Sequence, residues 1–214
     1  MKRLIYIRLI VFLLGLVVLS LGISITVKVQ HLGLHPWDVL SVGLYDKFGL
    51  TIGTWGIIIG LALTFVTLFL DRTYVRAGTY INIILVGIFI DFFLWLDFVP
   101  ETNNLFLDAV IITVGIIIMG IGGGMYNSVR LGAGPRDGFM LVISDKTGYS
   151  IRAVRITTES LVLVIGLIIG GPVFVFSFIF TFIQSPVFQF SYEKWTKWLH
   201  LMERRYVRKK ETAV

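Results

Sequence analysis

The chain of 214 residues contains no cysteine and only three histidines. The absence of cysteine excludes disulfides, a thiol nucleophile and a thiolate metal site. The histidines are His31, His35 and His200, and no HExxH or similar spacing joins them. We therefore expect no zinc or other metal site. No pairing of a nucleophile with a base is recognisable, so we expect neither an enzyme nor a bound cofactor.

Charge is also scarce, at 15% of residues, whereas hydrophobic residues make up 56% and the mean hydropathy is +0.87. A soluble domain cannot bury so much apolar surface, but a bilayer accommodates it in runs of about 20 residues. The first run is too long for a signal peptide and lacks a cleavage site, so we expect it to be retained. The fold predicted is an all-α, polytopic membrane helix bundle. The six apolar runs are Leu9–Val27, Thr51–Leu70, Ala77–Leu96, Phe106–Ser128, Ile151–Ile169 and Pro172–Phe190.

The basic residues predict the orientation in the membrane. Of the 19 Lys and Arg, only Lys28 and Lys47 fall outside if the N-terminus is cytoplasmic. The positive-inside rule therefore predicts a multi-pass protein of the cell membrane with both termini in the cytoplasm. The net charge of +6 is explained by helix ends and the tail, and nucleic acid is not an expected partner.

The sequence repeats itself at a constant spacing. Leu32-Gly33 and Pro36-x-Asp38 recur 99 residues later as Leu131-Gly132 and Pro135-x-Asp137, and the register continues without a gap through Asp-Lys and Gly. Two copies of a three-span unit are predicted, and the odd number of spans inserts the second copy upside down. The expected divisions are residues 1–98 for the first repeat, 99–191 for the second and 192–214 for a cytoplasmic tail.

Each repeat contains a short helix between its Pro and a Gly, namely Pro36–Gly49 and Pro135–Gly148. A helix of about 13 residues is about 20 Å long, too short to cross a bilayer, so it is either re-entrant or interfacial. Thr51 and Ser150 are then the expected N-caps of the following spans. One interpretation makes Asp38 and Asp137 helix caps only. The other places both N-termini, with Trp37, at a shared site for a ligand or ion.

The two repeated motifs also carry a family resemblance. Leu32-Gly33-x-x-Pro36-Trp37-Asp38, followed by Gly49-Leu50-Thr51-Ile52-Gly53-Thr54-Trp55, resembles the YczE/YyaS/YitT group of bacterial membrane proteins, and most closely its YczE-like branch. Leu131-Gly132-Ala133-Gly134-Pro135-Arg136-Asp137-Gly138 resembles the second motif of that group. The resemblance implies a multi-pass cell-membrane protein and supplies neither a substrate nor catalytic residues.

Glu159 is the deepest carboxylate of the predicted spans, about 13 Å into the fifth by helix rise. Arg155 precedes it by one turn on the same face, which predicts a structural pair. Coupling to an ion or proton is the alternative.

The tail predicts an amphipathic helix at the cytoplasmic interface that binds anionic lipids. The alternative is that this helix docks a partner protein. A homo-oligomer is also possible from the sequence. The residues expected on its apolar face are Trp195, Trp198, Leu199, Met202 and Tyr206.

Transport or permeation of an unknown small solute or ion is the leading functional hypothesis, because inverted repeats with broken helices are common in transporters. A regulatory or scaffold membrane protein that moves nothing is the second, and an intramembrane enzyme is a weaker third. The residues expected at the ligand or ion site are Asp38, Asp137, Pro36, Pro135, Trp37, Glu159 and Arg155.

Overall fold

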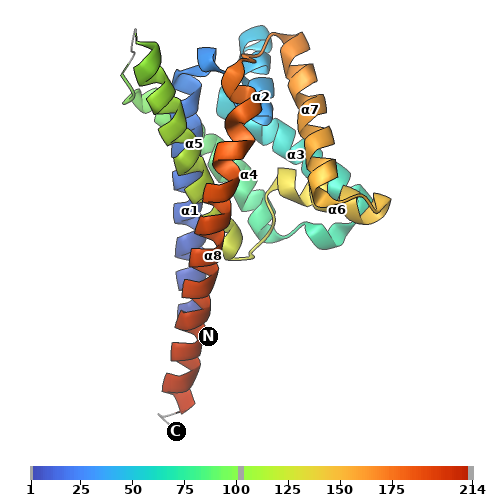
Figure 1. Cartoon of the computed structure of the whole chain (residues 1–214). Helices are drawn as coiled ribbons and strands as arrows, with labels where there is room; N and C mark the ends of the chain where they lie inside the picture. The colour runs from blue at the N-terminus through green and yellow to red at the C-terminus, as the bar shows by residue number, and fades with distance from the viewer. Residues whose placement is uncertain (1, 101–103, 212–214) are drawn as a thin grey trace.

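The computed structural model describes residues 2–100 and 104–211, and every regular element in them is helical (Figure 1). The all-α prediction is therefore confirmed. The elements are α1 (Lys2–Lys28), η1 (Gln30–Leu32), α2 (Pro36–Phe48), α3 (Ile52–Leu70), η2 (Arg72–Tyr74), α4 (Ala77–Leu96), α5 (Leu105–Ser128), α6 (Pro135–Thr147), α7 (Ile151–Ile169) and α8 (Val175–Glu211).

The helix boundaries follow the spacing of the sequence repeat. The short helices α2 and α6 each have 13 residues, and both their first and last residues are 99 apart. The same spacing relates both ends of α3 to those of α7. The repeated residues thus specify the same local structure twice.

These boundaries have local causes that the sequence predicted. Pro occupies the first turn of α2 and of α6, where its missing N–H costs no helical hydrogen bond. Gly49 and Gly148 follow these helices with φ of 76° and 75°, a region that favours glycine. The Thr51 hydroxyl accepts from the Thr54 N–H, and the Ser150 hydroxyl from the Ala153 N–H. Both predicted N-caps are confirmed.

Helices α1 and α5 cross closely and run in opposite directions (Figure 1). Glycines permit this approach, since a Cβ on Gly122 would lie 2.3 Å from the Leu19 backbone nitrogen. A Cβ on Gly22 would likewise lie 2.6 Å from the Met119 nitrogen. The other side of α5 packs against α8, where a Cβ on Gly124 would meet the Phe188 carbonyl oxygen at 2.5 Å.

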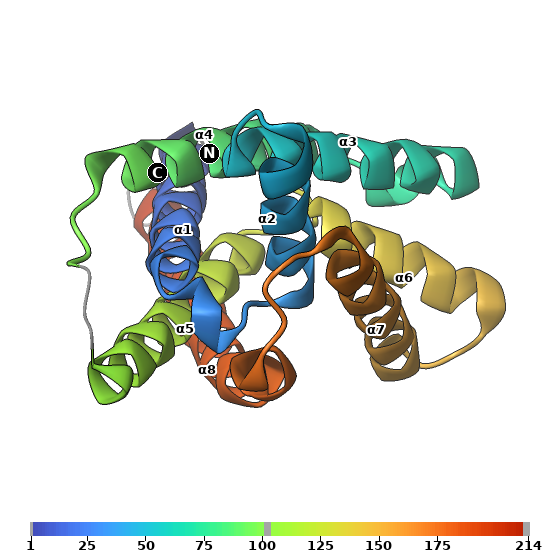
Figure 2. The same cartoon turned by 90° about the horizontal axis from the view of Figure 1, so that it is seen from above.

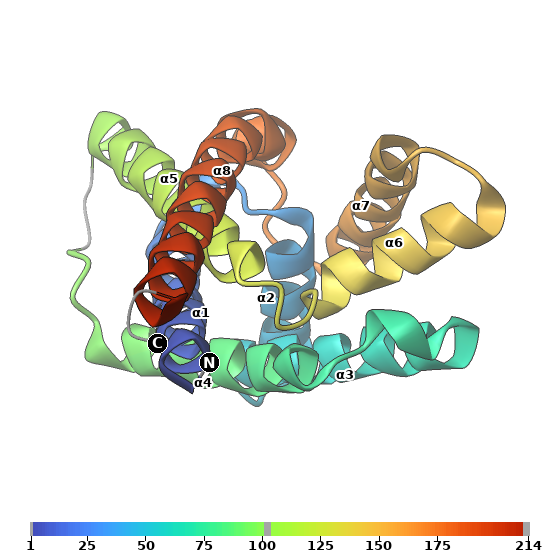
Figure 3. The same ribbon diagram turned by 90° about the horizontal axis from the view of Figure 1, so that it is seen from below.

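The short helices pack against the other half of the chain. α2 lies against α7, and α6 lies against α3, as the views from above and below show (Figures 2 and 3). In the repeat, α2 corresponds to α6 and α3 corresponds to α7, so the α2–α7 contact is the counterpart of the α6–α3 contact. Each half therefore contributes its short helix to the packing of the other.

Four of the described helices are long and apolar enough to cross a membrane, namely α1 from Leu4, α3, α4 and α5. In α7 the run is interrupted by Arg152, Arg155 and Glu159. Large apolar side chains remain at the surface, including Phe69 at 87% and Phe182 at 80% exposure. A surface of this kind is unusual for a soluble monomer and typical of one covered by lipid or protein.

The tail differs from its prediction as a separate interfacial helix, because α8 continues unbroken through residue 192 to Glu211. Its apolar face packs on the start of α1. Leu199 is 2% exposed and lies in a cluster with Phe12 and Leu16, and Trp195 packs against that cluster. Arg8 of α1 also pairs with Glu203. Trp198 stays 38% exposed, and the side chain of Tyr206 lies outside the described part.

Candidate functional site

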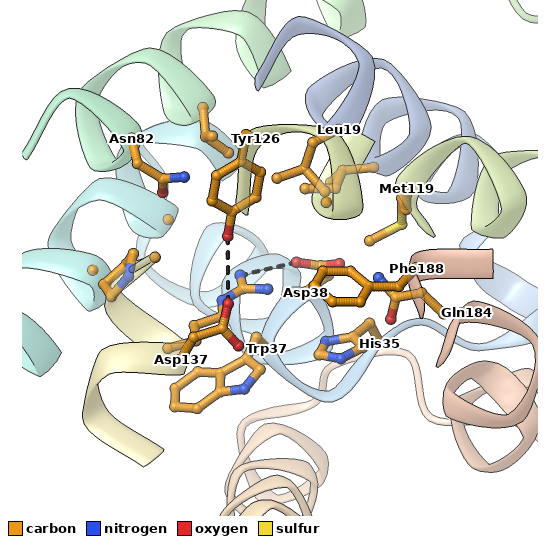
Figure 4. Close-up of a pocket in the computed structure, with 18 of the residues that line it drawn as sticks. Leu19, His35, Trp37, Asp38, Asn82, Met119, Tyr126, Asp137, Gln184 and Phe188 are labelled. Atoms are coloured by element: carbon orange, nitrogen blue, oxygen red, sulfur yellow. Dashed lines mark hydrogen bonds and ion pairs between the residues drawn. The ribbon is translucent and has the colours of Figure 1, made fainter. Parts of the chain in front are cut away.

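The N-terminal ends of α2 and α6 meet at one cavity inside the molecule (Figure 4). The cavity has a volume of about 320 Å³ and is lined from both halves of the chain. Helices α1, α3, α4, α5, α7 and α8 complete its wall. The histidine and the charged residues on it are His35, Asp38, Arg136, Asp137, Arg155 and Glu159.

Asp38 and Arg136 join the two short helices directly. An Arg136 Nη2–H donates to Asp38 Oδ1 over 3.1 Å, and the same guanidinium lies 5.5 Å from the centre of the Trp37 ring. Asp38 is 3% exposed, and its Oδ2 is buried without a protein hydrogen-bond partner. One cation of the second half thus contacts two neighbouring residues of the first. A buried carboxylate needs such a partner because an unpaired buried charge is costly.

Asp137, the counterpart of Asp38, has different partners. An Arg155 Nη2–H donates to Asp137 Oδ1 over 3.3 Å. The Tyr126 hydroxyl donates to Oδ2 over 3.4 Å (Figure 4). Asp137 is thereby fixed within the second half, to α7 and α5, whereas Asp38 is fixed across the two halves.

The predicted pair of Arg155 with Glu159 is wrong. Arg155 turns toward Asp137 instead, because α6 brings that carboxylate within reach of the guanidinium. The Glu159 carboxylate lies near the His35 imidazole, with Nε2 3.8 Å from Oε1. The Glu159 side chain is 14% exposed. It therefore stands at the cavity without a guanidinium partner.

The interpretation of Asp38 and Asp137 as caps and nothing more also fails. Their recorded donors are the side chains of Arg136 for Asp38, and of Arg155 and Tyr126 for Asp137, not helix N–H groups. The helix starts instead rely on Pro at the first turn and on the carbonyls of His35 and Gly134. The two carboxylates are free to face the cavity because the helices begin without them.

The two halves contribute unequal chemistry from equivalent positions. α7 places Arg155 and Glu159 on the wall, and the residues 99 earlier on α3 are Gly56 and Gly60, which also line the cavity. Trp37 and Arg136 are equivalent in the same way. Four of the five charged side chains on the wall therefore belong to the second half. The first half contributes Asp38, His35, the Trp37 ring and the space left by two glycines.

Six of the seven predicted site residues line this one cavity: Trp37, Asp38, Pro135, Asp137, Arg155 and Glu159. Pro36 is buried in the first turn of α2 and does not line it.

The prediction missed Arg136, His35 and Tyr126. Arg136 could have been found, because it stands at the repeat position of Trp37. His35 directly precedes the motif Pro. Tyr126 belongs to no motif, and only the tertiary structure brings its hydroxyl to Asp137.

The sequence matches a family of unknown function, DUF6198, over residues 6–193. It is 36% identical over 173 residues to the uncharacterized membrane protein YczE of Bacillus subtilis, covering 81% of this chain and 80% of that protein. The uncharacterized protein YyaS of the same bacterium is 34% identical over 162 residues, or 74% and 79% of the two chains. An uncharacterized protein of Haemophilus influenzae is 32% identical over 180 residues, or 84% and 81%.

No solved structure gives a significant match to the chain. The predicted resemblance is confirmed for YczE and YyaS by identity along most of each chain. The chain therefore belongs to the DUF6198 family.

Proposed function

We propose that this protein is an integral membrane transporter or permease for a small solute or ion, built from two inverted repeats around the central cavity. Its relative YczE is named as a membrane protein, and the exposed apolar side chains of this chain need a lipid environment. A cavity that joins two halves of opposite orientation can be opened to either side by moving one half against the other. The proposal assigns no catalytic residue.

The observation that carries the proposal is the Asp38–Arg136 contact on the cavity wall. It joins the starts of two helices that are too short to span a bilayer. Broken helices of this kind form binding sites in transporters, because irregular backbone is tolerated where it lines a cavity. A purely structural ion pair needs no adjoining cavity, and this one has a cavity of about 320 Å³.

The proposed topology has six spans, α1, α3, α4, α5, α7 and the first part of α8. α2 and α6 then enter from opposite faces. Arg155 and Glu159 of α7 line the cavity in this arrangement, and Arg155 also pairs with Asp137 of α6, which lowers the cost of placing these two charges at membrane depth. Arg152 lies in the first turn of α7, at the end of the proposed span. Both termini lie at the same end of the bundle (Figure 1), in agreement with an even number of spans.

The test is uptake by proteoliposomes of purified protein in a bacterial metabolite extract, with mass spectrometry of the vesicle contents. We expect at least one solute to accumulate over protein-free vesicles, and to accumulate less with Arg136→Ala. Arg152→Ala, an exposed substitution on α7, is the matched control and leaves uptake unchanged. Equal contents in vesicles with and without protein would refute transport and favour a regulatory or scaffold protein.

A further inference from the structure

The cavity wall carries more negative than positive charge. Its carboxylates are Asp38, Asp137 and Glu159, and its guanidiniums are Arg136 and Arg155. With a neutral His35 imidazole, one carboxylate is in excess. Each guanidinium already contacts one aspartate, so neither is a free cation for an incoming anion.

Two acceptor groups remain for a ligand. The Asp38 side chain is only 4% exposed, and its Oδ2 has no hydrogen-bond partner within the protein. A buried carboxylate oxygen without a donor costs free energy that a ligand N–H could recover. Glu159 is the second group. Arg155 pairs with Asp137 instead, and a hydrogen bond from the Thr181 side chain occupies only part of the acceptor capacity of a carboxylate. Both carboxylates face the same cavity.

The remainder of the wall suits an apolar body next to a cation. The rings of Trp37, Tyr126 and Phe188 line the same cavity (Figure 4). Aromatic faces attract cations and also cover alkyl groups. The cavity, at about 320 Å³, holds a small organic molecule.

A bare metal ion fits this wall less well. Within the described part of the chain, no three His, Asp or Glu side chains converge on a common point that could hold a metal. Divalent cations need such convergence, whereas an ammonium group is satisfied by a few acceptors beside an aromatic face.

Buried donors at the same wall favour an anion instead, and they must be weighed. The Trp37 Nε1–H, the Asn82 Nδ2–H and the Arg155 Nε–H have no protein acceptor. Arg155 is nevertheless already paired with Asp137, and an anion would face the uncompensated Glu159 carboxylate. A like charge in a low-dielectric cavity opposes binding more than the two neutral donors, Trp37 and Asn82, favour it. These donors can instead serve a hydroxyl or carbonyl on the ligand.

We infer that the cavity binds a small organic ammonium ion, with the cation held by Asp38 and Glu159 and its apolar body against Trp37, Tyr126 and Phe188. This inference rests on the proposed function and names the substrate class of the same cavity.

The test compares n-butylammonium, butyrate and n-butanol, which share a four-carbon skeleton and differ in charge. Purified full-length protein is titrated with each, and the melting temperature is measured, because a ligand that binds the folded state stabilises it. We expect n-butylammonium alone to raise the melting temperature. Glu159→Gln and Asp38→Asn should each weaken its apparent affinity at least about tenfold. Asp46→Asn, an exposed carboxylate on the same helix as Asp38, is the matched control and should not.

Glu159→Gln decides the test if Asp38→Asn fails to fold, because Glu159 has no guanidinium to leave unpaired. Stabilisation by butyrate rather than by n-butylammonium would overturn the inference. The same holds if none of the three compounds shifts the melting temperature, or if the shift by n-butylammonium survives Glu159→Gln.

The two proposals can fail separately. Binding of n-butylammonium without its uptake into proteoliposomes would leave the ligand class standing and refute transport. Uptake of only neutral or anionic solutes from the extract would do the reverse.

Discussion

At the scale of single residues, the chemistry of the site depends on which carboxylate each arginine selects. Arg136 reaches across to Asp38 in the other half, and Arg155 reaches Asp137 in its own. This leaves Glu159 unpaired by arginine and gives the cavity its excess of negative charge. The two contacts differ in burial, since the Asp38 side chain is 4% exposed and that of Asp137 is 31% exposed. Their energetic weights should differ accordingly.

Arg136→Ala should destabilise the protein by about 3–5 kcal/mol, because it leaves the buried Asp38 carboxylate without its cation. Asp38→Asn in the same molecule should restore part of that loss. The measurement is equilibrium unfolding in detergent, with the exposed Arg152→Ala as the control. Full additivity of the two substitutions would mean that the contact contributes nothing.

Arg155→Ala should couple to Asp137→Asn by about 0.2–1 kcal/mol, the range of partly exposed ion pairs. Its coupling to Glu159→Gln should be smaller, since no ion pair joins Arg155 to Glu159. Two double-mutant cycles on unfolding free energies measure both values. A larger coupling with Glu159 would restore the pair that the one-turn spacing suggests.

The choice of partner is also where sequence reasoning reaches its limit. Spacing along one helix correctly places Arg155 and Glu159 on the same face. It gives no information about α6, whose N-terminus brings Asp137 closer. Likewise Tyr126 lies in an apolar run without a motif, and only tertiary packing makes it a neighbour of Asp137.

At the scale of helices, prediction from sequence was more successful, because starts and ends are local. Pro and Gly residues lie at the boundaries of α2 and α6, and Thr51 and Ser150 cap α3 and α7. Each of these residues acts within one turn of its own position. The surroundings of the tail were harder to predict. The spacing of its apolar residues predicts an amphipathic face, but the sequence does not say whether that face covers lipid or α1. The structure places Leu199 against α1.

The α1–α5 crossing depends on glycine at the point of closest approach. Gly122→Ala should destabilise the protein by about 1–3 kcal/mol, because the new Cβ would meet backbone atoms of α1 that cannot move independently. Gly56→Ala is the matched control on α3, where a Cβ meets nothing within 4 Å. That change should be neutral or stabilise the helix by up to about 1 kcal/mol. Thermal unfolding of the two variants side by side checks the difference. Equal effects would show that close packing at Gly122 is not what the glycine provides.

At the scale of the whole molecule, the repeat predicts more than the apolar runs do. Run lengths alone give six candidate spans, whereas four of the described helices have the length and composition to cross a membrane. The constant spacing of 99 residues also predicts which helix of one half corresponds to which helix of the other. The α2–α7 and α3–α6 contacts agree with this correspondence, because each is the counterpart of the other. The side of the membrane from which each half is inserted needs a separate test.

Lys47 and Lys146 test that insertion as a matched pair. They are equivalent in the repeat, exposed, and near the ends of α2 and α6. Because the chain has no cysteine, single Lys47→Cys and Lys146→Cys variants carry unique labels. A membrane-impermeant maleimide should label Cys at position 47 in intact cells, and Cys at position 146 only after permeabilisation. Labelling of both from one side would contradict the inverted arrangement.

The contact between Trp37 and Arg136 depends on a difference between the two copies of the repeat. These two residues occupy the same place in the two halves, and their contact combines a ring with a cation. Two identical subunits would present this position twice over, as two rings or as two guanidiniums, and neither combination can form the contact. An assembly of identical copies therefore cannot contain it. The contact requires two copies of the repeat that differ at this position, and joining them in one chain keeps the unlike copies together in equal number.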